Sequence, residues 1–208
     1  MSKQKMKIVI IVGATCSGKD TLARKLVNEF GYKMVVSTTS RPMRNGEVEG
    51  REYYFITKEK SKEMLEKDMF IEHREYEVQN GDVWIYGITK DQFNGCKHVA
   101  IVDFNGMKSL LEYFKDKDVD IATIYVEACV YTRMLRYASR DKKDDETMYE
   151  CCRRILADKD EVEIAKPNCD IIVNTDDDGY DINKIEDNIN TVFGLKLIAK
   201  GFNMLFGV

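Results

Sequence analysis

The feature that most constrains this chain is a turn bounded by two glycines and followed by a lysine, Gly13-Ala14-Thr15-Cys16-Ser17-Gly18-Lys19-Asp20-Thr21. It follows a run of β-branched residues, 8–12, that is typical of a buried strand. It precedes apolar residues on one face of a predicted helix: Leu22, Ala23, Leu26, Val27 and Phe30. Strand, turn and helix in this order predict a phosphate-binding loop. The glycines let the backbone bend, the amides at the helix start point at the phosphate, and Lys19 follows the β- and γ-phosphates.

The residue after this lysine departs from the usual pattern. Such loops normally have Ser or Thr there, which binds Mg²⁺ through its hydroxyl; this chain has Asp20, followed by Thr21. A carboxylate is a hard oxygen ligand suited to Mg²⁺, and the helix dipole favours it at a helix start. We expect Asp20 to take the place of the hydroxyl, directly or through water. The alternative is a carboxylate at the helix start with no ligand role.

Length and composition narrow the class of protein. The 208 residues can bury one substantial core, and with two prolines and no Ser/Gly-rich linker they predict a single domain, 1–208. The net charge of −4 gives no argument for a nucleic-acid or membrane partner, and no signal peptide or membrane span is visible. The six cysteines show no metal-ligand spacing, so we expect reduced thiols and a cytoplasmic location. We interpret Cys16 as a small residue in a tight turn rather than as a reactive thiol.

Predicted strands and helices alternate along the rest of the chain. Strands are expected at residues 33–36, 99–103, 121–126 and 170–174, helices at 57–69, 107–114, 130–140, 147–165 and 182–193, and a hairpin at 70–86. Residues 141–146 have no apolar side chain and predict a surface loop. The alternation implies an α/β fold of the P-loop NTPase type, with three layers and a parallel central sheet. Ligands bind at the carboxyl ends of such strands, where the turn, Ser37, Asp103 and Asn174 fall.

An arginine-rich segment follows the second predicted strand. It runs Ser37-Thr38-Thr39-Ser40-Arg41-Pro42-Met43-Arg44-Asn45-Gly46-Glu47-Val48-Glu49-Gly50-Arg51-Glu52-Tyr53-Tyr54-Phe55. This segment resembles the acceptor segment of guanylate kinases, whose pattern is Ser, three residues, Arg-Pro-x-Arg-x-Gly-Glu, then Gly-x-x-Tyr-x-Phe. Arg41 and Arg44 can fork onto a phosphate dianion, and a tyrosine hydroxyl can complete the shell.

The resemblance covers residues 6–193 and implies Mg²⁺- and ATP-dependent phosphoryl transfer to a nucleoside monophosphate. Phe70-Ile71-Glu72 matches a family motif whose carboxylate accepts hydrogen bonds from guanine. The implied GMP-binding residues are Ser37, Arg41, Arg44, Tyr53, Glu72, Tyr86 and Asp103. The implied ATP-binding residues are Gly13 to Thr21, Arg136 and Asn174. The implied catalytic residues, which neutralise charge on the transferred phosphoryl group, are Lys19, Arg41, Arg140 and Arg154.

The base pocket departs from the family pattern. The family position whose Ser or Thr contacts guanine O6 is occupied by Ile88 in this chain. We expect Thr89, one place further on, to replace this contact in part. Ile101 replaces the first aspartate of the family's Asp-x-Asp-x-x-Gly motif. The hairpin before Tyr86 is also longer than in typical members. Because the charge-assisted bonds to Glu72 outweigh one lost hydrogen bond, we expect GMP or dGMP as the acceptor, with looser discrimination.

The resemblance also implies subregions and leaves other functions open. Residues 36–96 form the expected acceptor-binding subregion and about 139–150 the expected lid; the apolar tail, 195–208, lies outside the resemblance. We expect the tail to pack on the core, with a dimer seam or a membrane contact as alternatives. Other possible functions are a kinase for another nucleoside monophosphate and a non-catalytic module that binds proteins. The retained Gly13, Gly18 and Lys19 argue against the second; oligomeric state is left open.

Overall fold

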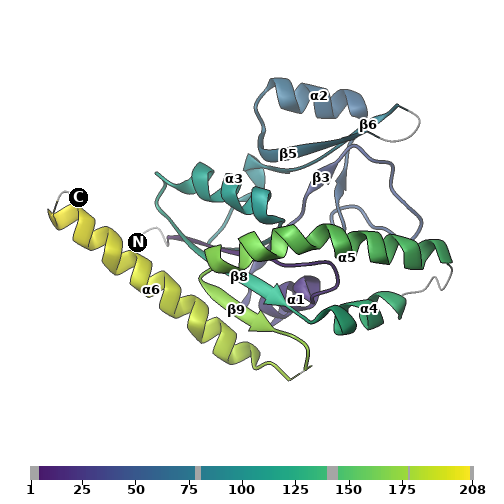
Figure 1. The fold of residues 1–208 in the computed structure, drawn as a ribbon. Coiled ribbons are helices and arrows are strands. Elements are labelled where there is room, and N and C mark those ends of the chain that lie inside the picture. The colour runs from purple at the N-terminus through teal and green to yellow at the C-terminus, as the bar shows by residue number, and fades with distance from the viewer. Residues whose placement is uncertain (1–4, 78–80, 140–144, 178, 207–208) are drawn as a thin grey trace.

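Five parallel strands form the centre of the computed structural model, which describes residues 5–77, 81–139, 145–177 and 179–206 (Figure 1). They are β1 (Met6–Val12), β2 (Lys33–Val35), β7 (Lys97–Ile101), β8 (Val119–Glu127) and β9 (Ile171–Asn174). Their order in the sheet is β2-β7-β1-β8-β9, and each neighbouring pair is parallel. The run predicted to be a buried strand is central, since Ile8 to Val12 are each 0% exposed. The predicted parallel sheet is therefore confirmed.

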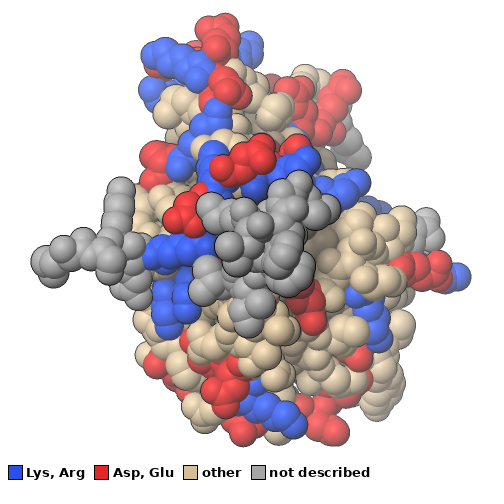
Figure 2. Space-filling view, turned by 90° about the vertical axis from the view of Figure 1, so that its left-hand side faces the viewer, with Lys and Arg blue, Asp and Glu red and all other residues tan. Residues whose placement is uncertain are grey.

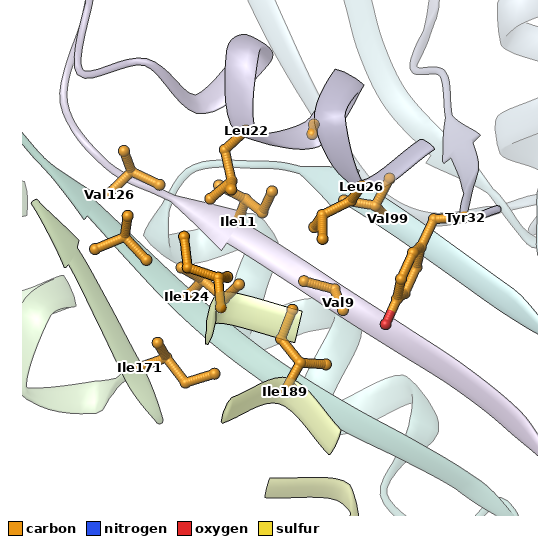
Figure 3. Close-up of a cluster of buried hydrophobic side chains, with 14 of the residues drawn as sticks. Val9, Ile11, Leu22, Leu26, Tyr32, Val99, Ile124, Val126, Ile171 and Ile189 are labelled. Carbon is orange, nitrogen blue, oxygen red and sulfur yellow. The ribbon is translucent and has the colours of Figure 1, made fainter. Parts of the chain in front are cut away.

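Helices cover both faces of this sheet. Alternate residues of a strand point to opposite faces, so Val9 and Ile11 pack against α1 (Lys19–Phe30) and α6 (Ile182–Phe206), as Figure 3 shows for part of this cluster. Ile8 and Ile10 pack on the other face, against α3 (Phe104–Phe114) and the end of α5 (Asp145–Ala165). Helix, sheet and helix make the three layers that the sequence predicts.

A second, smaller sheet lies beside the first and is built from residues 38–89. Its strands are β3 (Thr38–Thr39), β4 (Tyr54–Phe55), β5 (Phe70–Glu77) and β6 (Val83–Thr89), in the order β4-β3-β6-β5. The predicted hairpin is the antiparallel pair of β5 and β6. Helix α2 (Lys58–Glu66) packs on this sheet through Met64, which joins Phe70 and Ile85 in a small apolar cluster. As predicted, Thr57 caps α2 by accepting a hydrogen bond from the Lys60 amide.

The predicted loop at 141–146 needs a correction. Residues 141–146 were expected to form a loop, but α5 begins at Asp145, so 145–146 are helical; residues 140–144 lie outside the described part. A helix start at Asp145 and Glu146 is in keeping with the preference of acidic residues for helix N-termini. Helix α4 (Val130–Ala138) precedes it, and α5 ends at Ala165, before Pro167. Single 3₁₀ turns span Lys90–Gln92 and Lys166–Asn168.

The tail continues the last predicted helix, because α6 extends to Phe206. At its start, Lys196 Nζ donates to the Ile121 carbonyl (2.9 Å) and to the Asp170 carboxylate (2.8 Å), which ties the helix to the sheet. Among the described residues, no helix is both long and apolar enough to cross a membrane. On the face shown in Figure 2, acidic and basic side chains are interspersed, in keeping with the small net charge of −4.

Candidate active site

The predicted phosphate-binding loop lies between the carboxyl end of β1 and the start of α1. Gly13 has φ 151°, and a Cβ there would lie 2.3 Å from the Val126 carbonyl oxygen, so a side chain would force the backbone apart. Gly18 (φ 98°) caps α1 in a left-handed conformation. Cys16 is also left-handed (φ 60°), so the tight turn accounts for a small residue at this position. Lys19 Nζ donates to the carbonyls of Gly13 (2.7 Å) and Ala14 (2.9 Å).

A cavity of about 340 Å³ opens at this loop, lined by Cys16 to Thr21, Arg136, Thr175 and Tyr180. Arg136 donates to the Cys16 carbonyl (3.4 Å) and to Thr175 Oγ1 (3.0 Å), and Thr175 Oγ1 donates to the Ser17 carbonyl (2.6 Å). Asn174, which the resemblance puts beside adenine, does not line this cavity. Its side chain accepts a hydrogen bond from the Asp176 amide (2.8 Å). Thr175, the next residue, holds the loop instead.

A buried ion pair supports the other side of the loop. Arg133 on α4 donates to the Thr15 carbonyl (2.8 Å) and to the Asp158 carboxylate (2.6 Å). Asp158 on α5 accepts from the Thr15 amide (2.7 Å). The side chains of Arg133 and Asp158 are 6% and 18% exposed. Helices α4 and α5 are therefore both fastened to the phosphate-binding loop through Thr15.

Breaking this pair should cost stability. Arg133→Met would leave the Asp158 carboxylate without its counter-charge, and removing one partner of a buried ion pair costs about 3 kcal/mol. For a chain of this length the melting temperature should fall by roughly 8 °C, measured by differential scanning calorimetry. The matched control is Arg153→Met, because Arg153 pairs with Glu150 on the surface, with side chains 66% and 35% exposed. That change should cost less than about 1 kcal/mol; equal losses in the two variants would contradict this role for Arg133.

A larger cavity of about 870 Å³ lies between the two sheets and α5. It is lined by all of the expected GMP-binding residues and by several others: Ser37, Arg41, Arg44, Glu47, Tyr53, Glu72, Arg74, Tyr76, Glu77, Trp84, Tyr86, Gly87, Ile101, Val102, Asp103, Gly106, Glu150, Arg153 and Arg154. A third cavity, of about 810 Å³, shares Ser37, Tyr53 and Ile101 with this one and Asp20 with the loop cavity. The shared residues link the phosphate-binding loop to the acceptor residues.

Arg41 is held in place within the acceptor cavity. Its guanidinium forks onto Glu47 (2.8 and 3.1 Å) and is 3% exposed. The hydrogen bond from Arg41 lowers the pKa of Glu47. Glu47 also accepts from the Arg44 amide (2.7 Å), so one carboxylate organises the turn that carries both arginines. The Tyr53 ring lies 5.5 Å from the Arg41 guanidinium and packs edge-on against Tyr86 at 5.6 Å.

The acidic residues of the cavity come from two elements. Glu72 projects from β5, where burial raises the pKa of its carboxyl group and the neighbouring Arg74 lowers it. Asp103 caps α3, with Oδ1 accepting from the Gly106 amide (2.9 Å), while Oδ2 forms an ion pair with Arg74. Burial disfavours the charged form of a carboxyl group, and a nearby guanidinium favours it.

The expected substitute for the missing O6 contact does not reach this cavity. Ile88 is 0% exposed and packs in the main core, opposite Glu72 in the strand pair. Thr89 is 3% exposed and lines a separate cavity with Lys33 and Met64. Successive residues of a strand point to opposite faces, so Thr89 lies on the wrong side of β6. The expectation that Thr89 partly replaces the O6 contact is therefore wrong.

Helix α5 brings two arginines to the acceptor cavity. Arg153 and Arg154 both donate to Glu150, at 2.6 and 2.7 Å, and these hydrogen bonds lower the pKa of Glu150 to about 2. Arg140, which is expected to be catalytic together with Arg154, lies outside the described residues. Arg154 and Asp158 are four residues apart and share one helix face. The fastening of Asp158 to the loop therefore also fixes the backbone that carries Arg154.

Sequence reasoning missed several residues of the site: Arg74, Arg133, Asp158 and Thr175. Three of them carry a signal in the sequence. Arg133 precedes Arg136 by one helical turn, and Asp158 follows Arg154 by one, so each falls on the helix face of an expected site residue. Thr175 follows Asn174 at the end of β9, where ligand-contacting residues are expected.

A phosphate-binding loop at the end of a parallel sheet, linked to an arginine-rich acceptor cavity, defines a P-loop nucleotide kinase. A family model described as Guanylate kinase matches residues 5–192. The guanylate kinase of Clostridioides difficile is 36% identical over 115 residues, 54% of this chain and 50% of that protein. The guanylate kinase of Sus scrofa is 29% identical over 167 residues, 76% of this chain and 78% of that protein.

The solved structures agree on the fold. A crystal structure of guanylate kinase from Anaplasma phagocytophilum matches with a TM-score of 0.59 and 20% identity, covering 93% of this chain and 87% of that chain. The chain belongs to the guanylate kinase family. These matches confirm the family and the fold expected from the sequence. They also confirm the expected class of enzyme, a nucleoside monophosphate kinase that phosphorylates GMP with ATP.

Proposed function

We propose that this chain transfers the γ-phosphoryl group of ATP to GMP or dGMP and releases ADP with GDP or dGDP. The observation that carries this proposal is the link between the cavities: Asp20 and Ser37 connect the loop of Lys19 to the cavity that contains Glu72 and Arg41. A phosphate donor held at one end and a guanine read at the other would meet between them. In-line phosphoryl transfer needs mainly this positioning together with neutralisation of charge.

The proposed roles follow from chemistry and position. The loop amides and Lys19 would hold the β- and γ-phosphates, with Arg136 beside them. Arg41, Arg44, Tyr53 and Tyr86 would hold the acceptor phosphate, and Lys19, Arg140 and Arg154 would balance the charge that builds on the transferred group. Arg154 would have to exchange Glu150 for a phosphate oxygen. Closure of the segment 139–150 would exclude water, which otherwise competes as the acceptor.

The residues at the loop fit a magnesium ion shared with the nucleotide. Among the described residues, no group of three or more His, Cys, Asp or Glu side chains could hold a metal. Mg²⁺ keeps several waters and is usually held by one or two carboxylates plus substrate phosphates, which matches the single Asp20 at the loop cavity. When bound, the ion would neutralise charge on the phosphates. Asp20 would orient it, directly or through water.

Asp20→Asn should raise the Mg²⁺ concentration needed for half-maximal turnover by about tenfold, because a neutral amide is a weaker ligand for this hard cation. The measurement is a Mg²⁺ titration at saturating ATP and GMP. Glu29→Gln, at the exposed far end of α1, is the matched control and should leave the titration unchanged. If the Mg²⁺ titration curves of Asp20→Asn and the wild type coincided, Asp20 would not be a magnesium ligand and would only favour the helix start.

The direct test is a reaction of the chain with ATP, Mg²⁺ and GMP, with nucleotides separated by ion-exchange chromatography. We expect ADP and GDP in equal amounts, and ADP release that depends on GMP. ADP release of the same size without an acceptor, or no release at all, would contradict the proposal. The second result would favour the non-catalytic module. The expected cytoplasmic location stays a prediction.

A further inference from the structure

Arg74 faces the acceptor cavity from the middle of the lengthened hairpin. In β5, residues 72, 74 and 76 share one strand face, and all three line the cavity. The Arg74 guanidinium reaches across the cavity to Asp103 at the start of α3, and the two side chains are 33% and 25% exposed. A cation thus lies between two carboxylates, Glu72 on its own strand and Asp103 opposite.

The guanine base presents two kinds of polar group to such a cavity. Its N1–H and exocyclic amine are donors and suit a carboxylate, whereas O6 and N7 are acceptors and need a donor. Ile88 is fully buried and has no polar atom, and Thr89 lies on the other face of β6. Ile88 and Thr89 therefore offer the two acceptors of the base no donor, and the donors that β6 does bring to the cavity are those of Trp84 and Tyr86, the second of which is proposed to hold the phosphate.

Three of the other four arginines of the cavity pair with Glu47 or Glu150, and the fourth, Arg44, lies on the turn proposed to hold the acceptor phosphate. Arg41 forks onto Glu47, and Arg153 and Arg154 are held by Glu150 on α5. Arg74 comes from the same strand face as Glu72, about 6.8 Å further along the strand, a spacing that lets the two side chains reach adjacent edges of one purine. Its guanidinium has five donors in a rigid fork, so the ion pair with Asp103 orients it without using all of them.

We propose that Arg74 is a base-specificity residue, an inference that rests on the proposed function. The Arg74 guanidinium donates to O6 and N7 of guanine, while Glu72 accepts from N1–H and the exocyclic amine. Arginine paired to guanine O6 and N7 is the commonest base-specific contact in protein–DNA complexes, and a free guanine offers the same two acceptors. Adenine carries an amine where guanine has O6, and two donors would then face each other. Arg74 thus supplies the discrimination that Ile88 cannot.

The test is equilibrium binding, measured by isothermal titration calorimetry, of GMP, 7-deaza-GMP and IMP. 7-Deaza-GMP lacks only N7 as an acceptor, and IMP lacks only the exocyclic amine. The wild type should bind 7-deaza-GMP about tenfold more weakly than GMP. Arg74→Met should lose this preference and still bind IMP more weakly than GMP. Glu72→Gln is the matched control and should do the reverse, keeping the preference for N7 and losing the one for the amine.

Two further variants keep the proposal falsifiable if Arg74→Met does not fold, which thermal unfolding of each variant would reveal. Arg74→Lys keeps the charge beside Asp103 but offers one ammonium in place of the fork, so it should weaken the N7 preference. Arg74→Met/Asp103→Asn removes both charges and should lose this preference. A preserved ratio of GMP to 7-deaza-GMP affinity in the folded variants would overturn the proposal. Equal weakening of all three ligands would also overturn it, since Arg74 would then serve the phosphate or the fold. Binding needs no turnover, so a wild type that binds as expected but transfers nothing contradicts only the proposed function.

Discussion

Lys19→Ala should lower the turnover of this chain by about a hundred- to a thousandfold, the usual loss when one charge-stabilising donor is removed from a transition state. Lys19 lines the loop cavity, and its ammonium donates to the carbonyls of Gly13 and Ala14. When phosphates occupy the loop, the same flexible side chain can turn to them. Charge on the transferred group is greatest in the transition state, so kcat should fall more than the affinity for ATP.

The control for this result is a lysine outside the site. Lys62 lies on the exposed side of α2, and Lys62→Ala should leave turnover within twofold of the wild type. Circular dichroism and the melting temperature of Lys19→Ala should stay close to those of the wild type, because Lys19 packs in neither core cluster. Unchanged turnover in a folded Lys19→Ala variant would remove the proposed mechanism.

Glu72→Gln should raise the KM for GMP by about ten- to a hundredfold and narrow the difference between GMP and AMP. The Glu72 carboxylate can accept from both guanine donors, and hydrogen bonds to a charged group are worth roughly 1.5–3 kcal/mol. An amide accepts through one atom and turns an N–H group toward a donor. The loss concerns the base, so the KM for ATP should not change. Steady-state kinetics with each substrate varied in turn measures this.

Glu75→Gln is the matched control, since Glu75 lies on the same strand but on its opposite, exposed face and does not line the acceptor cavity. Its kinetics should equal those of the wild type. If Glu72→Gln left the KM for GMP unchanged, the base would have to be read by other residues, and the lengthened hairpin would be the first place to look.

The parts of the fold that the sequence predicts are those with strong local signals. The β-branched run at 8–12 forms the central strand, and the one-sided apolar residues of α1 and α3 pack as expected. The two-residue strands β3 and β4 were missed, because their existence depends on pairing with partners far along the chain, such as Thr38 with Gly87. Two residues carry no periodicity, so no local pattern could reveal them.

The site was predictable where a motif is contiguous and not where it depends on packing. The loop at 13–21 and the segment at 37–55 are motifs with fixed spacing, and both line the linked cavities. Arg133 and Asp158 are 25 residues apart, and only the packing of α4 against α5 brings them to Thr15. The error at Thr89 has a simple cause: one step along a strand turns a side chain to the other face.

The most direct test of the central claim, a kinase for guanine nucleotides, is a competition in one vessel. The wild-type chain is mixed with limiting ATP, Mg²⁺ and equal concentrations of GMP, dGMP, isotopically labelled AMP, UMP and dTMP, and the diphosphates are separated and quantified. The label distinguishes ADP formed from AMP from the ADP that ATP leaves in every transfer. In such a mixture the products form in the ratio of the kcat/KM values of the acceptors. We expect GDP and dGDP to dominate, with smaller but measurable amounts of the others. A mixture in which ADP formed from AMP, UDP or dTDP exceeds GDP and dGDP would contradict this account of the pocket.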